Sequence, residues 1–178
     1  AGLAIAQVYD ETIYINSAIS LVQQNIYVGG SFAVLILICF LRSFRATLIV
    51  SMAIPVSVVA SFVAMAAMGR SINVISLAGI AFAVGMVVDA AIVVLENIFR
   101  HREQGKSLRE ASLQGSQEVA TAITASTLTT IAVFVPVLFI GGIAAQNFQQ
   151  LAYVVSFSLL CSLAIALTVV PALCARLL

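Results

Sequence analysis

The sequence predicts an all-α membrane protein, a bundle of five transmembrane helices. Three observations support this fold class: 62% of the 178 residues are hydrophobic, only 8% are charged, and five apolar runs alternate with short polar segments. A soluble globular domain carries about 25% charged residues, so most of this chain is expected to lie within a lipid bilayer. The net charge of +1 gives no reason to expect a nucleic-acid partner. The cysteines lack metal-ligand spacing, and no metal or cofactor is expected.

The predicted boundaries follow the apolar runs. Residues 1–8 are expected to be a linker or the end of a missing periplasmic domain. The bundle is expected over residues 9–178, with spans at 13–41, 46–68, 72–99, 118–140 and 148–178, and a polar cytoplasmic loop at 100–117. The absence of an initial Met and of a cleavable signal suggests a fragment of a longer polypeptide.

The first two spans differ in character. Span 13–41 mixes polar and apolar residues before its apolar run begins at Ile26, which suits an amphipathic extension that leads into the membrane. Span 46–68 is apolar throughout and carries Pro55 near its middle. Proline removes a backbone hydrogen bond from a helix, so we expect a kink at this position.

The third span contains one acid, Asp89, well inside the apolar run LAGIAFAVGMVVDAAIVVLEN. Burying a carboxylate in hydrocarbon is costly, so an acid inside a membrane is a functional-site hypothesis by default. Ala81 and Gly85 form a row of small residues on the same helix face, where a neighbouring helix can approach closely. We expect Asp89 to take and give protons inside a helix bundle. The alternative is a structural acid that is hydrogen-bonded to a Ser or Thr of another span.

Supporting residues are predicted on both sides of the loop. Glu96 and Asn97 end the apolar run that holds Asp89, and the alternative for both is an interfacial cap. Thr127 and Thr130 belong to the threonine-rich half of the fourth span, where they could hydrogen-bond Asp89 or carry water. Alternatively, these hydroxyls bond carbonyls of their own helix.

Three other positions are assigned more ordinary roles. Pro136 and Pro171 are expected to kink the fourth and fifth spans, as Pro55 is expected to kink the second. His101 lies in the basic loop and is expected to be an exposed interfacial residue. The alternatives are gates for the prolines and a proton relay for His101.

The distribution of basic residues predicts the orientation in the membrane. The chain has eight Lys and Arg residues, and with five alternating spans only Arg70 falls on the side opposite the others. Cytoplasmic loops carry an excess of Lys and Arg. We therefore expect a periplasmic N-terminus and a cytoplasmic C-terminus.

Four blocks of the sequence, in this order, resemble the resistance–nodulation–division (RND) efflux transporters: FLRSFRATLIVSMAIPVSVV, SINVISLAGIAFAVGMVVDAAIVVLENIFRH, TTIAVFVPVLFIGG and LTVVPALCA. The chain looks most like the inner-membrane pump subunit of the multidrug (hydrophobe/amphiphile) type. The match is to transmembrane helices 2–6 of the N-terminal half of such a pump. The five helices would then be part of a larger RND transmembrane domain.

The resemblance implies a function for Asp89, because this family couples export to proton influx through acids on the corresponding helix. A lysine and hydroxyl residues of the other half engage these acids. Drug-exporting members usually carry Asp-Asp, whereas this chain has Asp89 followed by Ala90. A single acid followed by a small residue also occurs in the heavy-metal branch, so the departure leaves the branch and the proton stoichiometry open.

The expected function is proton/substrate antiport that exports drugs or other amphiphiles across the bacterial inner membrane. The alternatives are a heavy-metal-type RND exporter, a Sec-type protein-export accessory protein and a structural membrane component. An enzyme is not expected, because an intramembrane aspartyl protease needs two membrane acids. The expected partners are the lipid bilayer and the missing second half of the polypeptide. The resemblance further implies a homotrimer with a periplasmic adaptor and an outer-membrane channel.

Overall fold

The protein is a bundle of five long α-helices and one short 3-10 helix, and the described residues contain no strand. The structure, a computed structural model, describes residues 11–41, 43–69 and 73–178. The elements are α1 (Glu11–Leu41), α2 (Phe44–Ala67), α3 (Val74–Glu103), α4 (Leu108–Phe134), η1 (Val135–Phe139) and α5 (Ile143–Leu177). The predicted fold class, an all-α membrane helix bundle, is confirmed.

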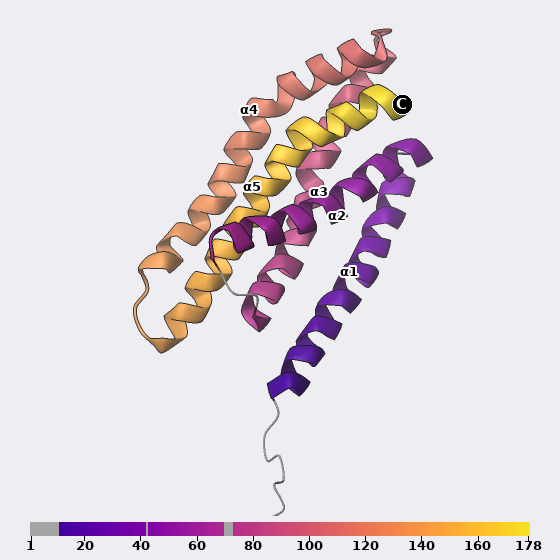
Figure 1. Cartoon of the computed structure of the whole chain (residues 1–178). Coiled ribbons are helices and arrows are strands. Elements are labelled where there is room, and N and C mark those ends of the chain that lie inside the picture. The colour runs from indigo at the N-terminus through magenta and orange to yellow at the C-terminus, as the bar shows by residue number, and fades with distance from the viewer. Residues whose placement is uncertain (1–10, 42, 70–72) are drawn as a thin grey trace, which may run out of the picture.

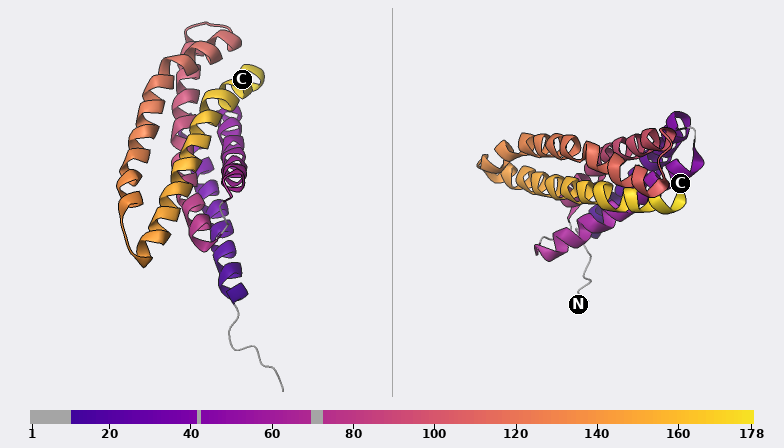
Figure 2. Two further views of the ribbon diagram at one scale, coloured as in Figure 1. Left: turned by 60° about the vertical axis from the view of Figure 1, so that its left-hand side comes forward. Right: turned by 90° about the horizontal axis from the view of Figure 1, so that it is seen from above.

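The helices run alternately up and down, so their connections gather at two ends of the molecule (Figures 1 and 2). One end holds the α1–α2 connection, the α3–α4 connection and the C-terminus of α5. We call it the basic end, because most of the basic side chains belong to its segments: Arg45, Arg100, Arg102, Lys106, Arg109 and Arg176. The opposite end holds the beginning of α1 and the α4–α5 turn.

The central helix of the bundle is α3, which packs against all four other long helices. It begins with a capping box, in which Asn73 and Ser76 satisfy each other's backbone N–H groups. The Asn73 amide also donates to the Gln150 side-chain oxygen on α5, at 2.9 Å. This cap fixes the start of α3 against α5, the helix with which α3 makes its largest interface.

The apolar core forms two clusters along the bundle. The larger cluster lies toward the basic end and joins α2, α3 and α5 through fully buried residues such as Ile49, Leu95 and Val170. The smaller cluster lies toward the opposite end and is centred on Met65, Ile80 and Val154. The bundle is therefore most densely packed near its basic end.

The α4–α5 turn is built around proline and glutamine. The α-helical part of α4 ends at Phe134, and the chain continues as the 3-10 helix η1, with Pro136 in its first turn. The Gln149 amide from α5 donates to the carbonyl oxygens of Leu138 and Ile140, both at 3.1 Å. Carbonyls at a helix end lack partners in their own helix, so this side chain satisfies two of them.

The polar stretch 100–117 is mostly helical rather than a loop. α3 continues through Glu103, and α4 already begins at Leu108, where Ser107 and Glu110 form a capping box. Only Gln104–Ser107 connects the two helices. The predicted polar loop treated polarity as a loop signal, and the S-x-x-E pattern at Ser107 is the helix-start signal that sets the beginning of α4.

Four helical segments are long and apolar enough to cross a membrane: Phe44–Ala67, Val74–Glu103, Leu108–Phe139 and Ala145–Leu177. Within the described part of α1, the apolar helical stretch is the shorter Tyr27–Ile36. Among the described residues, α1 contacts only α2 and α3. The five-span topology therefore depends on the sequence argument for α1 and stays a prediction.

Candidate functional site

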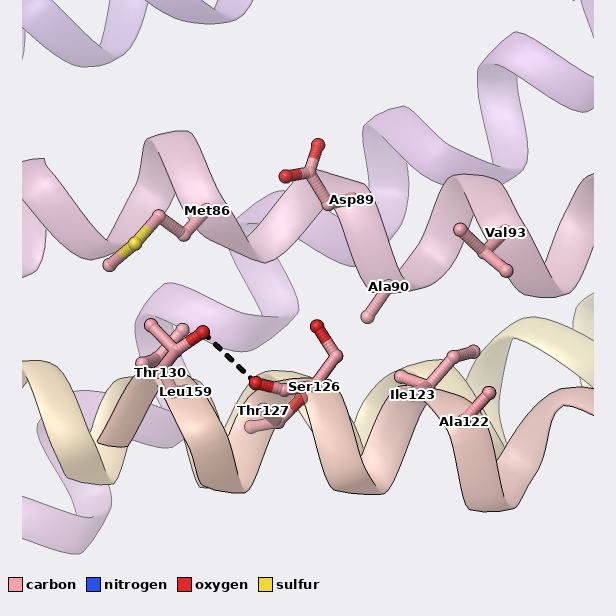
Figure 3. Close-up of a pocket in the computed structure, with 10 residues that line it drawn as sticks. All are labelled: Met86, Asp89, Ala90, Val93, Ala122, Ile123, Ser126, Thr127, Thr130 and Leu159. Carbon is pink, nitrogen blue, oxygen red and sulfur yellow. Dashed lines mark hydrogen bonds between the residues drawn. The ribbon is translucent and has the colours of Figure 1, made fainter. Parts of the chain in front are cut away.

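A cavity of about 330 Å³ lies between α3 and α4, halfway along the bundle (Figure 3). It is lined from α3 by Met86, Asp89, Ala90 and Val93, from α4 by Ala122, Ile123, Ser126, Thr127 and Thr130, and from α5 by Leu159. Three of the predicted site residues, Asp89, Thr127 and Thr130, thus line one cavity.

The position of Asp89 follows from the way α3 is packed. Its neighbours Val88 and Ala91 are buried in the bundle core, at 9% and 2% exposure. Because successive helical residues are 100° apart, Asp89 lies on a different flank of α3 and is exposed in this bundle. Figure 3 shows its carboxylate pointing away from α4, whereas Ala90 points toward α4 and the Ser126 side chain.

The Asp89 carboxylate makes no hydrogen bond to any other residue that the structure describes. A buried carboxylate normally has partners for its oxygens, because desolvation without them is costly. The acid is instead located at the rim of the cavity and is exposed among the residues that the structure describes. That placement leaves the carboxylate accessible to a group from outside this bundle.

The threonines of α4 mostly bond their own helix. The Thr130 hydroxyl donates to the Ser126 carbonyl at 3.0 Å, and Thr124 and Thr129 bond the carbonyls four residues earlier in the same way. The alternative that these hydroxyls back-bond in their helix therefore holds for these three residues. A hydroxyl that donates to a carbonyl still has lone pairs to accept from water, so Thr130 keeps a polar surface in the cavity.

Glu96 and Asn97 lie in a second cavity of about 470 Å³, which shares Val93 with the first. Glu96 is exposed, whereas Asn97 is buried and donates to the Gly115 carbonyl of α4 at 2.8 Å. Neither residue caps α3, because the helix continues to Glu103. The interfacial alternative for both residues stays a prediction, and neither residue lines the cavity that holds Asp89.

The predicted proline positions fall at three different places. Pro55 lies inside α2 and Pro171 inside α5, and both helices continue through them. Pro136 lies where α4 gives way to η1. Proline cannot donate the hydrogen bond that an α-helix needs at this position, which explains the change of helix type at Pro136.

Two groups of residues were missed by the sequence analysis. Ser126 lines the Asp89 cavity, and its spacing of four residues from Thr130 was a signal that both share a helix face. His101 was expected to be exposed but is buried at 8% exposure and contacts Glu118. The missed signal was the continuation of α3 past Asn97, which places His101 on the same face as Asn97.

The sequence matches the AcrB/AcrD/AcrF family over residues 1–178. The chain belongs to this family. The resemblance to RND efflux transporters that the four sequence blocks indicated is thereby confirmed. Membership of the AcrB/AcrD/AcrF family also accounts for the apolar composition, since the chain is a multi-pass membrane protein.

Individual relatives of the AcrB/AcrD/AcrF family agree. The chain is 42% identical over 176 residues to the multidrug resistance protein MdtC of Pectobacterium atrosepticum, and these residues are 99% of this chain and 17% of that protein. The values are the same for MdtC of Klebsiella pneumoniae subsp. pneumoniae. For MdtC of Escherichia coli O139:H28, the identity is 40% over 172 residues, 97% of this chain and 17% of that protein. The chain thus spans only about 17% of the length of the curated relatives it matches.

Proposed function

We propose that this chain is part of a proton-driven secondary active transporter that exports drugs or other amphiphiles across the bacterial inner membrane. Asp89 is the proton-carrying residue in this proposal. One observation carries it: a single acid without a hydrogen-bond partner among the described residues lies in the middle of the apolar central helix, beside a hydroxyl-lined cavity. The substrate class is taken from the relatives, which are named multidrug resistance proteins.

The coupling chemistry follows from the surroundings of a membrane carboxylate. Desolvation raises the pKa of a carboxylate, while a nearby ammonium lowers it. An acid that alternates between a cationic partner and an apolar surrounding therefore binds and releases a proton in turn. If the two states expose it to opposite sides, proton flow shifts the conformational equilibrium. This gives proton influx a direct means to drive a conformational cycle.

The cationic partner is expected from outside this chain. Among the described residues, the single lysine is Lys106, which lies in the α3–α4 connection and not in a span. The exposed flank of Asp89 and the fraction of the relatives' length that the chain covers both support a partner from another part of the full-length protein. A lysine from a further helix would approach Asp89 on the flank that faces away from α4.

The cavity supports a water-mediated route to the acid. At about 30 Å³ per water molecule, a space of about 330 Å³ has room for several waters. The hydroxyls of Ser126, Thr127 and Thr130 offer polar contacts to such waters along α4. Ala90 leaves this space free, since a larger side chain at this position would project into it.

The proposed setting has the N-terminus in the periplasm and the C-terminus in the cytoplasm. The basic side chains of the α1–α2 and α3–α4 connections and of the end of α5 share one end of the bundle, which supports a cytoplasmic location for that end. In the full-length protein we expect a homotrimer that works with a periplasmic adaptor and an outer-membrane channel. Glu96 and Asn97 then lie on the cytoplasmic side of Asp89.

A heavy-metal-type exporter is the second candidate, and the single acid Asp89-Ala90 is the observation that favours it. Export measured with hydrophobic drugs and, separately, with Cu⁺, Ag⁺ and Zn²⁺ distinguishes the two candidates. We expect drugs to be exported and the metal ions not to be exported. Metal export without drug export would assign the protein to the heavy-metal branch.

The test of the central proposal is Asp89→Asn in the full-length transporter, with Glu96→Gln as the matched control. Both substitutions change a carboxylate to an amide on α3, but only the first removes the acid at the cavity. We expect Asp89→Asn to abolish proton-coupled export and Glu96→Gln to reduce it by less than about threefold. The measurements are drug efflux from cells at matched expression and proton uptake in proteoliposomes. Normal coupled export by Asp89→Asn would end the proposal.

A further inference from the structure

A chain of polar side chains joins α3 to α4 at the basic end. We call it the junction cluster; its members are Asn97, His101, Lys106, Gln114 and Glu118. His101 Nε2 lies 2.6 Å from Glu118 Oε2, and His101 Nδ1 lies 2.6 Å from Lys106 Nζ. Lys106 Nζ also donates to Gln114 Oε1 at 2.8 Å, and Asn97 Nδ2 donates to Glu118 Oε2 at 3.3 Å. One ring nitrogen of His101 thus contacts a carboxylate, and the other contacts an ammonium.

The donors and acceptors of the cluster determine which nitrogen carries the hydrogen. A lysine ammonium has only donors, and an ionised carboxylate has only acceptors. Nδ1 must therefore accept from Lys106, and Nε2 must carry the hydrogen that is donated to Glu118. This arrangement requires His101 to be neutral and in its Nε2–H form. The geometry is complete only while Nδ1 has a free lone pair.

A second proton on His101 is incompatible with the Lys106 contact. Protonated Nδ1 becomes a donor and would face an ammonium at 2.6 Å, with like charges on both groups. The contact to Glu118 has the opposite response, because a hydrogen bond between an imidazolium and a carboxylate is charge-assisted and stronger. Protonation therefore breaks one link of the cluster and strengthens the other.

The charged groups around the ring favour this exchange. Glu118 faces the imidazole from α4, Lys106 faces it from the α3–α4 connection, and Arg100 acts on the same carboxylate from α3. When the ammonium of Lys106 leaves, the proton on His101 replaces its positive charge beside Glu118. The cluster then keeps its balance of charges, while the connection loses its anchor.

We propose that His101 is a second proton-binding site of this protein, at which a proton displaces the Lys106 ammonium. In the neutral state, Lys106 joins the connection to both His101 and Gln114. In the protonated state, the Lys106 contact to His101 is lost and the connection Gln104–Ser107 becomes more mobile, although Arg102 still donates to the Lys106 carbonyl. α3 and α4 stay joined through Glu118 and Asn97. The site does not involve Asp89, so it stands independently of the proposed transport function.

The exchange is tested in the full-length transporter with a spin label at Gln104, an exposed residue of the connection. The label is introduced as Gln104→Cys in a background with the native cysteines replaced, and its mobility is measured from pH 8 to pH 5. We expect the mobile fraction to rise at least threefold as the pH falls. A label at Gln146, an exposed residue near the start of α5, is the control and should not respond. An unchanged mobile fraction at Gln104 would overturn the proposal.

Two variants separate the exchange from a general effect of acid. In His101→Gln, the amide can donate to Glu118 and accept from Lys106 but cannot gain a proton, so the label should stay immobile at both pH values. In Lys106→Met, the anchor is absent, so the label should be mobile at both. A pH response in His101→Gln equal to that of the parent would overturn the proposal. Lys106→Met provides a second test if His101→Gln fails to accumulate. A label that stays immobile at pH 8 in Lys106→Met would also overturn the proposal.

Discussion

α3 and α4 lie side by side over most of their length, but their contact differs sharply between two regions. Near the basic end, Gly115 packs so closely that an added Cβ would lie 2.9 Å from the Ile98 Cα atom. Halfway along the bundle, a cavity of about 330 Å³ separates Ala90 from Ser126 and Thr127. One region is joined by backbone packing and hydrogen bonds, whereas the other is open and lined with hydroxyls.

The difference indicates where this helix pair can move. A close contact between backbones has little freedom, because packed interiors resist small displacements. α4 also packs against α5, but it is the least buried of the four apolar helices within the described residues. A displacement of α4 that pivots near Gly115 would therefore widen or close the Asp89 cavity and leave the basic end unchanged.

The largest effect is expected from Gly115→Val, which removes the close contact. Its branched side chain would meet the Ile98 backbone, and overpacking of this kind costs typically 1–3 kcal/mol, and more where the backbone cannot shift. We expect lower expression and a thermal midpoint reduced by several degrees in detergent. Gly115→Ala should show the same change at smaller size. Unchanged stability in both variants would mean that the helices do not pack this closely.

A smaller loss is expected from Asn97→Ala in the same region. The substitution removes the side-chain donor to the Gly115 carbonyl, which keeps its donor within α4, and one donor to Glu118. A typical hydrogen bond contributes about 0.5–1.5 kcal/mol, and we expect a loss in this range because the carboxylate keeps His101. Thermal unfolding of the variant and of Asn97→Asp, which keeps the size but loses the donor, measures this loss. A destabilisation by Asn97→Ala alone would assign the effect to volume instead.

In the open region, Gly85→Ala is expected to be nearly neutral for these five helices. No atom lies within 4 Å of the position that its Cβ would occupy. Alanine stabilises a helix interior relative to glycine by up to about 1 kcal/mol. We therefore expect Gly85→Ala to raise the stability of α3 slightly. In the full-length transporter, a loss of stability would show that another helix packs on the Ala81–Gly85 row.

The smallest stability effect is expected from Thr130→Val at the cavity. Valine keeps the shape and removes one hydroxyl that bonds within its own helix, so we expect a change below about 0.5 kcal/mol. If waters in the cavity serve Asp89, proton uptake should nevertheless slow by several fold. Thr129→Val is the control, since Thr129 is exposed and does not line the cavity. Equal rates of proton uptake in the two variants would show that the cavity is not part of the proton route.

The helices and the acid Asp89 could be predicted from the sequence, because both depend on local signals. Apolar runs identify helices that can span a membrane, and Asp89 stands out as the single acid in the middle of one. The threonine spacing was also sufficient to place Thr127 and Thr130 on one helix. The family resemblance added the proton role, which the residues alone could only suggest.

The junction cluster was not predictable in the same way. It depends on how far α3 continues beyond Asn97 and on where α4 begins, and boundaries of elements are poorly determined by polarity alone. Once the connection is short, His101 and Glu118 must meet, but the sequence offered a long loop as the simpler interpretation. The orientation of the Asp89 carboxylate could not be predicted either, because it depends on how α3 is rotated against the four other long helices.

The 3-10 segment at the end of α4 has a consequence for length. A 3-10 helix rises about 2.0 Å per residue, against 1.5 Å in an α-helix. The five residues Val135–Phe139 therefore reach about 2.5 Å farther than the same residues would in an α-helix. The α4–α5 turn gains this reach without an inserted residue, and Gln149 provides hydrogen bonds for two carbonyls there. Pro136 thus lengthens the end of this hairpin along the helix axis.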